Sequence, residues 1–417
     1  MTESLEQKQP QKERKNALQI FLEEIRGGTL IVPLLAVVTG LLLGGLIVAL
    51  TTEQAYSTFS QSPLRAIQIG LRAAWNSYVA LFNGSIGNPA RIIDAFQSGD
   101  AVAIRRALNP FFGSLTRSIP FIYAGLAVAL GFRAGLFNIG AEGQLFMGAT
   151  LGVWIGFAIT GLPAIIHVPL ALMAGFLGGA LWGFVPGLLK AYTGAHEVIT
   201  TIMMNFIAFR LNEWLLRGPL QRPDSFNPVS PFIQDSAKLP RFFGDPIRFH
   251  LGFFISLGVA WLVYWLLFKT RWGFDLRTVG ASPNAARYAG MSITFLIILA
   301  MTLSGGLAGM AGVNEVIGVN YNLALAFSAG FGFDSIALAL LGKSHPLGVV
   351  LAALLFGTLQ NGAIQMQVSA GIPIDIIRIM QALILAFIAA PAIIRTIYRL
   401  RTPEYVEEAF VQGWGGD

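Results

Sequence analysis

The feature that most limits the fold of this chain is a succession of long apolar segments. The first, TLIVPLLAVVTGLLLGGLIVAL at residues 29–50, contains no charged residue and is long enough for a membrane-spanning helix, which needs about 20 residues. The segments that follow lie near residues 119–132, 143–160, 163–189, 197–216, 251–268, 293–318, 327–342, 346–368 and 373–395. The sequence therefore predicts an all-α polytopic membrane protein with about ten transmembrane helices. An even number of spans would leave both ends of the chain on the same side of the membrane.

The composition agrees with a membrane protein. Only 12% of the residues are charged, against about a quarter in soluble proteins. The 47 glycines and 20 prolines suit membrane helices, where neighbouring helices satisfy freed backbone groups. The chain has no cysteine, which excludes disulfides and thiolate chemistry. Its net charge of +6 comes mostly from basic residues beside apolar segments, so we expect no nucleic-acid partner.

Charge also predicts the orientation in the membrane. If the N-terminal tail (residues 1–28) is cytoplasmic, the basic residues Arg133, Lys190 and Lys343 all lie at inner connections, as the positive-inside rule requires. The loop 269–292 and the C-terminal tail 396–417 are then cytoplasmic as well. The span 29–50 leads to an outer insertion at 51–118, and residues 119–395 form the membrane core.

Within the insertion, apolar residues recur at helical spacing. They are Leu64, Ile67, Leu71, Trp75 and Tyr78, and Arg65 and Arg72 lie between them. This pattern is typical of an amphipathic helix that lies on the membrane surface.

Glycines predict where helices approach closely. Gly175, Gly179, Gly183 and Gly187 recur every four residues and form one stripe along a helix, and Gly305 and Gly309 repeat the spacing. Small residues of this kind let neighbouring membrane helices come into close contact.

Two blocks of the core resemble each other in organisation. Four spans lie within 119–216 and four within 293–395, and in each block the second span is interrupted by polar residues and glycine. The interruptions read FNIGAEGQ (137–144) and FGFDSIALA (331–339). Paired broken segments in corresponding positions indicate an internal repeat and a transport site near the interface between the repeats.

Polar side chains inside the spans are the candidates for that site. A charged residue at the bilayer centre costs about 2.5 to 3.5 kcal/mol, so such residues face the bundle interior or a water-filled cavity. For any single residue a structural hydrogen bond between helices is an equally good explanation, but the set as a whole favours a polar pathway. Its members are Asn138, Glu142, Gln144, Glu197, Thr201, Asn205, Glu315, Asp334, Gln360 and Asn361.

No catalytic pattern accompanies these residues. His167, His196, His250 and His345 fit no zinc motif. The segment ALALLGKS (337–344) imitates the end of a phosphate-binding loop, but Ala337 replaces the first glycine and the segment is apolar. We therefore expect no metal, no cofactor and no ATPase site in this chain.

The loop 269–292 carries a short helix signal. In SPNAARYAG, Ser282 is a helix N-cap and Pro283 opens the first turn. NAARYAG (284–290) resembles the EAAxxxG pattern that importer permeases insert into their ATPase subunits, with Asn284 in place of the glutamate.

Four ordered segments, 125–149, 196–208, 277–292 and 304–318, resemble the permease subunits of bacterial ATP-binding-cassette importers for nucleosides and simple sugars, within the branched-chain amino acid and ribose permease superfamily. The resemblance implies a pathway subunit in the bacterial inner (plasma) membrane with the fold of a type II importer permease. It also implies separate ATPase subunits, a second permease that more often differs from this one, and an extracytoplasmic substrate-binding lipoprotein. The residues that would contact the ATPase are Gly280, Asn284, Ala285, Ala286, Arg287 and Gly290.

One alternative function remains open from the residues alone. In an ion-coupled secondary transporter, the carboxylates Glu142, Glu197, Glu315 and Asp334 would carry protons or sodium.

Overall fold

The structure is a computed structural model that describes residues 31–223, 225–328, 330–373 and 375–400. The predicted N-terminal tail and most of the predicted C-terminal tail lie outside these residues. The described part of the chain contains two isolated β-bridges but no strand, so the all-α fold is confirmed.

The helices follow the chain in this order. The N-terminal ones are α2 (Ile31–Thr51), α3 (Glu53–Phe59), α4 (Pro63–Ser85) and α5 (Pro89–Ser98). The central ones are α6 (Ala101–Arg133), α7 (Ala141–Ala158), α8 (Ala164–Thr193), α9 (Glu197–Arg217), the short η1 (Asp235–Ala237), α10 (Gly252–Lys269), α11 (Arg271–Ala281) and α12 (Pro283–Tyr288). The C-terminal ones are α13 (Ile293–Glu315), the π-helical η2 (Val316–Asn320), α14 (Phe331–Leu341), α15 (Pro346–Ala370), α16 (Asp375–Ala389) and α17 (Pro391–Ile397).

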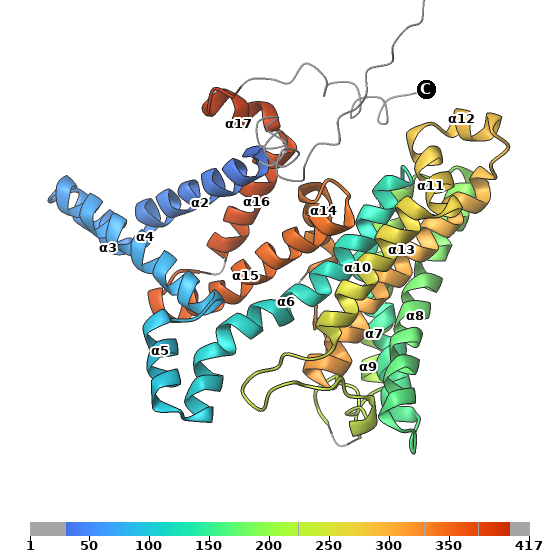
Figure 1. The fold of residues 1–417 in the computed structure, drawn as a ribbon, viewed down its shortest axis with the longest axis horizontal. Helices are drawn as coiled ribbons and strands as arrows, with labels where there is room; N and C mark the ends of the chain where they lie inside the picture. The colour runs from blue at the N-terminus through green and yellow to red at the C-terminus, as the bar shows by residue number, and fades with distance from the viewer. Residues whose placement is uncertain (1–30, 224, 329, 374, 401–417) are drawn as a thin grey trace, which may run out of the picture.

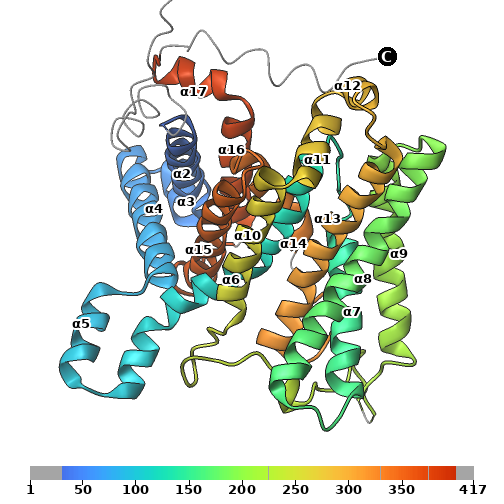
Figure 2. The ribbon, with the colours of Figure 1, turned by 45° about the vertical axis from the view of Figure 1, so that its right-hand side comes forward.

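Six of the described helices are long and apolar enough to cross a membrane, namely α2, α6, α8, α10, α13 with η2, and α15. Helices α16 and α17 could form a seventh span, but they bend by 89° at the break between them. The segment expected to span at 327–342 is helical only over the 11 residues of α14, about 16 Å of helix against a hydrocarbon core of about 30 Å. Helices α7 and α9 have 18 and 21 residues and run beside α8 (Figure 2).

Helix α6 connects two groups of helices. It runs obliquely from the corner at α5 to the far end of the molecule beside α10 (Figure 1). Helices α7 and α8 pack against α13, and α14 and α15 pack against α6, while α6 and α13 pack against each other. Each block of the core therefore packs its second and third helices on the first helix of the other block, as an internal repeat predicts.

The predicted glycine stripe lies at the contact between α8 and α13. A Cβ atom on Gly179 would overlap the carbonyl oxygen of Gly305 and lie 2.7 Å from Cα of Gly309. Gly183 meets the backbone of Met301 in the same way. The close helix contact predicted from the glycine spacing is confirmed.

The insertion 51–118 folds into α3, α4, α5 and the N-terminal half of α6. Helix α4 packs against α2 and α15 through a face of small residues that includes Ala66, Gly70 and Ala74. Leu64 and Trp75, which we expected on the membrane-facing side of a surface helix, are 77% and 71% exposed. Because small side chains permit close packing, Gly70 lies against the backbone of Ala49 on α2, and the larger Tyr78 and Leu81 near the end of α4 also pack against α2 and α15.

Candidate functional site

A polar network holds the break between α6 and α7. The Nδ2 atom of Asn138 donates to Oε1 of Gln144 (2.7 Å) and to Oγ of Ser304 on α13 (2.8 Å). The Oδ1 atom of Asn138 accepts from the backbone N–H of Gly140 (3.0 Å). Asn138, Gln144 and Ser304 are all buried. Since buried polar groups require partners, these bonds fix a segment that has no helix of its own.

Helix α9 contributes a second tie to the same break. Asn205 accepts from the backbone N–H of Gly143 (2.8 Å) and donates to the carbonyl oxygen of Ile139 (2.9 Å). Thr201, one turn earlier on α9, is fully buried, and a Cβ on Gly140 would lie 3.0 Å from its Cβ. The predicted stripe of Thr201 and Asn205 therefore faces the break, whereas Glu197 lies at the start of the helix and pairs with Lys190 (2.9 Å).

Glu142 joins the two interrupted segments that the sequence placed in corresponding positions. Its Oε2 atom accepts from the backbone N–H of Gly332 (2.6 Å). A Cβ on Gly332 would lie 2.5 Å from Cα of Glu142, so the N-termini of α7 and α14 meet at this point. Unpaired N–H groups give helix N-termini a positive character, and the buried carboxylate of Glu142 offsets it at this junction.

The candidates on α14 and α15 differ in how fully they are bonded. Asn361 donates to the carbonyl oxygens of Gly84 and Pro110 (2.9 Å each) and so ties α15 to α4 and α6. Gln360 reaches Asp334 through a single long contact of 3.4 Å. Asp334 and Gln360 are only partly buried, so both keep hydrogen-bonding capacity.

Glu315, the last residue of α13, is the least engaged candidate. Within the described ranges its carboxylate has no hydrogen bond and no ion pair. Arg117 of α6 and Arg248 of the loop before α10 are the cations that act on it electrostatically. An intramembrane carboxylate without a direct partner is a candidate for contact with a solute.

Sequence reasoning missed three buried polar residues near Glu315. Among the described residues, the Tyr123 hydroxyl, Nδ2 of Asn314 and Nε2 of His250 are buried without a hydrogen bond of good geometry. Burial and the nearby charge of Arg241 lower the pKa of His250 to about 4. Asn314 directly precedes Glu315 in VNEV, so the sequence could have identified it as a further polar residue inside a span. Nothing in the apolar sequence around Tyr123 distinguishes its hydroxyl.

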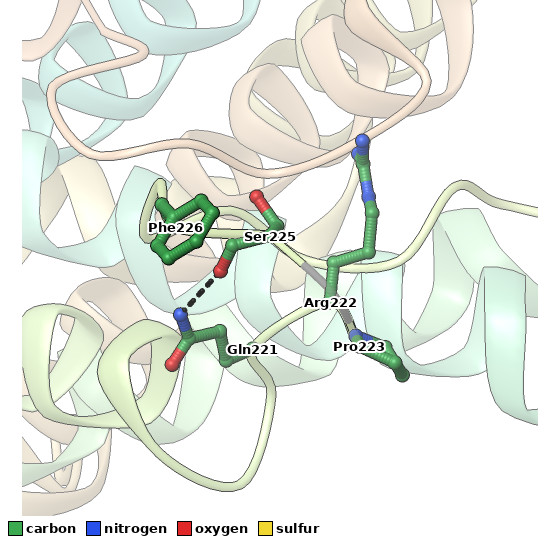
Figure 3. A pocket seen from close by; sticks show the side chains of 5 residues that line it. All are labelled: Gln221, Arg222, Pro223, Ser225 and Phe226. Carbon is green, nitrogen blue, oxygen red and sulfur yellow. Dashed lines mark hydrogen bonds between the residues drawn. The ribbon is translucent and has the colours of Figure 1, made fainter.

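A shallow pocket lies in the loop that follows α9, the same loop in which His250 lies closer to α10. Its volume is about 560 Å³, and its lining includes Gln221, Arg222 and Phe226 (Figure 3). The amide of Gln221 donates to the carbonyl oxygen of Ser225 (2.9 Å). None of the predicted pathway residues lines this pocket.

The loop 269–292 contains the short helix that its sequence predicts, α12, and also the helix α11 (Arg271–Ala281), which was not predicted and which Thr270 caps by accepting from the backbone N–H of Gly273 (3.1 Å). Ser282 caps α12 and accepts from the backbone N–H of Ala285 (3.3 Å). Gly290, which follows the helix, has a φ of +76°. A Cβ on Gly280 would lie 2.7 Å from the backbone nitrogen of Gly135, so the loop lies directly against the break between α6 and α7. Ala286 is buried, while the neighbouring residues Asn284, Ala285 and Arg287 are exposed.

Comparisons with known proteins agree with this arrangement. The family model described as "Branched-chain amino acid transport system / permease component" matches residues 111–392. The chain is 38% identical to the guanosine ABC transporter permease protein NupP of Bacillus subtilis, over 88% of this chain and 95% of that protein. It is 24% identical to NupQ, a guanosine ABC transporter permease protein of the same bacterium, over 63% of this chain and 83% of that protein.

A third relative is the glucose ABC transporter permease protein TsgB13 of Haloferax volcanii. It is 38% identical over 66% of this chain and 74% of that protein. No solved structure matches the chain.

Proposed function

This chain belongs to the family of permease components of branched-chain amino acid transport systems, and we propose that it forms the inward pathway for nucleosides or related simple sugars in an ATP-binding-cassette importer. The observation that carries this proposal is the similarity to a guanosine permease over 88% of the chain. Asparagine, glutamine and carboxylate side chains in the core suit such solutes, because they pair with sugar hydroxyls and base edges.

The ten polar candidates divide into three roles. Asn138, Glu142, Gln144, Thr201, Asn205 and Asn361 are buried or bonded at helix contacts, which supports a role in holding the broken helices in place. Glu315, Asp334 and Gln360 keep unused hydrogen-bonding capacity, so we assign solute contact to these three. Glu197 pairs with Lys190 at the start of α9 and would close the inner end of the pathway.

Energy would come from separate ATPase subunits, and the loop 269–292 would transmit it. Tyr288 is 98% exposed and would contact an ATPase subunit together with Asn284, Ala285 and Arg287. Gly280 contacts the backbone at Gly135. A push on α12 would therefore reach the break between α6 and α7, and through Glu142 the start of α14.

The other partners follow from the same family. Bacillus subtilis has two similar guanosine permease proteins, NupP and NupQ, which supports a heterodimer of this chain with a second permease. Helices α12 and α17 lie at one end of the molecule, and α5 and the loop after α9 lie at the other (Figure 1). This arrangement supports cytoplasmic termini in a bacterial inner membrane and an outer face that receives solute from a substrate-binding lipoprotein.

Uptake by the reconstituted importer tests the substrate class. The chain, its second permease, the ATPase subunits and the binding lipoprotein are placed in liposomes, and uptake of radiolabelled guanosine is measured in competition with glucose, ribose and leucine. We expect unlabelled nucleosides to compete best. Competition by leucine alone would contradict the substrate proposal while leaving the family assignment intact.

A further inference from the structure

Three buried polar groups lie together beneath the outer loop, residues 218–251, and each has one atom that makes no hydrogen bond of good geometry. The Tyr123 hydroxyl on α6 faces the Asn314 amide on α13. A Cβ on Gly252 would lie 2.5 Å from Oδ1 of Asn314 and 2.7 Å from Nδ1 of His250, so these two side chains enclose the same glycine. The three groups therefore form one cluster to which α6, α13 and the segment before α10 each contribute a residue.

The cluster contrasts with the network at the α6–α7 break. There, Asn138, Gln144 and Asn205 all have hydrogen-bond partners within 3.1 Å. In the cluster, Tyr123 and His250 are 0% exposed and Asn314 is 1% exposed, yet one polar atom of each is unpaired. A buried unpaired donor is costly, and a set of three in one place requires an explanation.

The chemistry of the cluster defines what it could bind. Nδ1 of His250 accepts from the backbone N–H of Gly252 (3.1 Å), so the hydrogen of the neutral ring is on Nε2. Asn314 offers its Nδ2 hydrogens, and Tyr123 offers a hydroxyl that can donate or accept. The cluster therefore suits a neutral solute that has both acceptor atoms and hydroxyl or N–H donors.

The cluster is closed in this conformation by the outer loop, residues 218–251. Backbone N–H groups of this loop donate to η2 and the residue that follows it, from Leu239 to Ile317 and from Ile233 to Tyr321 (3.0 Å each). A Cβ on Gly318 in η2 would lie 2.5 Å from Nε2 of His250. η2 is a π-helical segment, a kind of element frequent at functional sites. Because Gly318 of η2 lies against Nε2 of His250, separation of the loop from η2 would uncover this nitrogen.

From this arrangement we propose that Tyr123, Asn314 and His250 form an outer solute subsite that donates hydrogen bonds to a nucleoside when the outer loop separates from η2. The proposal rests on the proposed function and deepens it, because it names the groups that receive the solute before it reaches Asp334 and Gln360.

The test uses the complete importer and the variants Tyr123→Phe and Asn314→Leu. Binding of radiolabelled guanosine is measured on the complex without the binding lipoprotein, and guanosine uptake is measured with that lipoprotein at saturation. Each lost hydrogen bond is expected to weaken binding about 2- to 10-fold and to slow uptake. The melting temperature of the solute-free complex should stay unchanged or rise, because each variant removes an unpaired buried group.

Tyr78→Phe is the matched control. The Tyr78 hydroxyl donates to the carbonyl oxygen of Leu41 on α2, far from the outer loop. This variant should lower the melting temperature and leave guanosine binding unchanged.

Two results would overturn the subsite. One is normal guanosine binding and uptake in both variants with a raised melting temperature. The other is a fall in melting temperature like that of Tyr78→Phe, which would show that the groups are already paired. The proposed function itself fails only if the wild-type importer takes up neither nucleosides nor sugars, so the two failures are distinguishable.

Discussion

Replacement of Gly179 by alanine should separate helices α8 and α13. The added Cβ would lie 2.7 Å from Cα of Gly309, whereas ordinary van der Waals contact begins at 3.4 Å. The helices must therefore move apart by at least 0.7 Å (3.4 − 2.7) at this point, and further to clear the carbonyl oxygen of Gly305. A gap of 0.5 to 1 Å forfeits about a quarter to a half of the attraction between facing atoms.

The expected cost is about 1 to 3 kcal/mol, the usual range for an overpacked core. At roughly 2 to 4 °C per kcal/mol, the melting temperature of the purified chain should fall by about 2 to 12 °C. Thermal unfolding in detergent, followed by the intrinsic fluorescence of tryptophan, measures this shift.

Gly258→Ala is the matched control. Gly258 lies in the middle of α10, is exposed, and would have nothing within 4 Å of an added Cβ. Alanine is also the better helix former, so this variant should not lose stability. If Gly179→Ala melts at the same temperature as Gly258→Ala, the close α8–α13 contact does not exist in the folded protein, and the packing argument is refuted.

Three further predictions concern His250 in the loop 218–251, Gly290 in the loop 269–292, and the junction of α7 with α14. The pKa of His250 is lowered from 6.5 to about 4, so between these pH values the unfolded chain binds a proton that the folded chain does not. The free energy of unfolding should therefore fall by about 3 kcal/mol as the pH drops from 6.5 to 4. A melting temperature that depends on pH in the same way in His250→Gln would contradict this. Gly290→Val should abolish guanosine-stimulated ATP hydrolysis by the importer, because a β-branched residue is strained at φ +76°. Gly290→Asn should retain this activity, because asparagine tolerates that conformation. Normal guanosine-stimulated ATP hydrolysis in the valine variant would contradict the role given to the loop. Glu142→Gln keeps an oxygen acceptor for the Gly332 N–H, so the importer with this variant should assemble and transport. Glu142→Leu leaves that N–H unpaired and should lower the free energy of unfolding by about 1 to 3 kcal/mol. An assembled but inactive Glu142→Gln importer would show that the solute path needs the charge.

The helices and their close contacts could be predicted because both depend on local patterns. The apolar segments at 29–50 and 346–368 correspond to α2 and α15, and the four-residue spacing of Gly175 and Gly179 marks the face that α13 contacts. The same reasoning extended α14 too far, because the apolar residues before Phe331 belong to a connection. Gly330 starts the helix with a φ of +94°, and hydropathy does not reveal where a buried connection becomes a helix.

The roles of the polar residues could not be predicted, because their partners are distant in the sequence. Glu142 and Gly332 are separated by 190 positions, and Asn138 and Ser304 by 166. The sequence identifies each polar side chain inside a span, but only the fold shows which ones are saturated, like Asn138, and which remain unpaired, like Asn314. The short helix α12 is the exception, since Ser282, Pro283 and Gly290 define it through local capping alone.

The energy source of uptake tests the central claim most directly. This chain, its second permease and the ATPase subunits are placed in liposomes, and the binding lipoprotein and radiolabelled guanosine are added outside. The liposomes contain either ATP or a non-hydrolysable ATP analogue. Uptake is measured with and without proton and sodium gradients. We predict concentrative guanosine uptake that requires hydrolysable ATP and is unaffected by the collapse of either gradient. Uptake that proceeds without ATP and stops when a gradient is collapsed would contradict the account and identify an ion-coupled transporter.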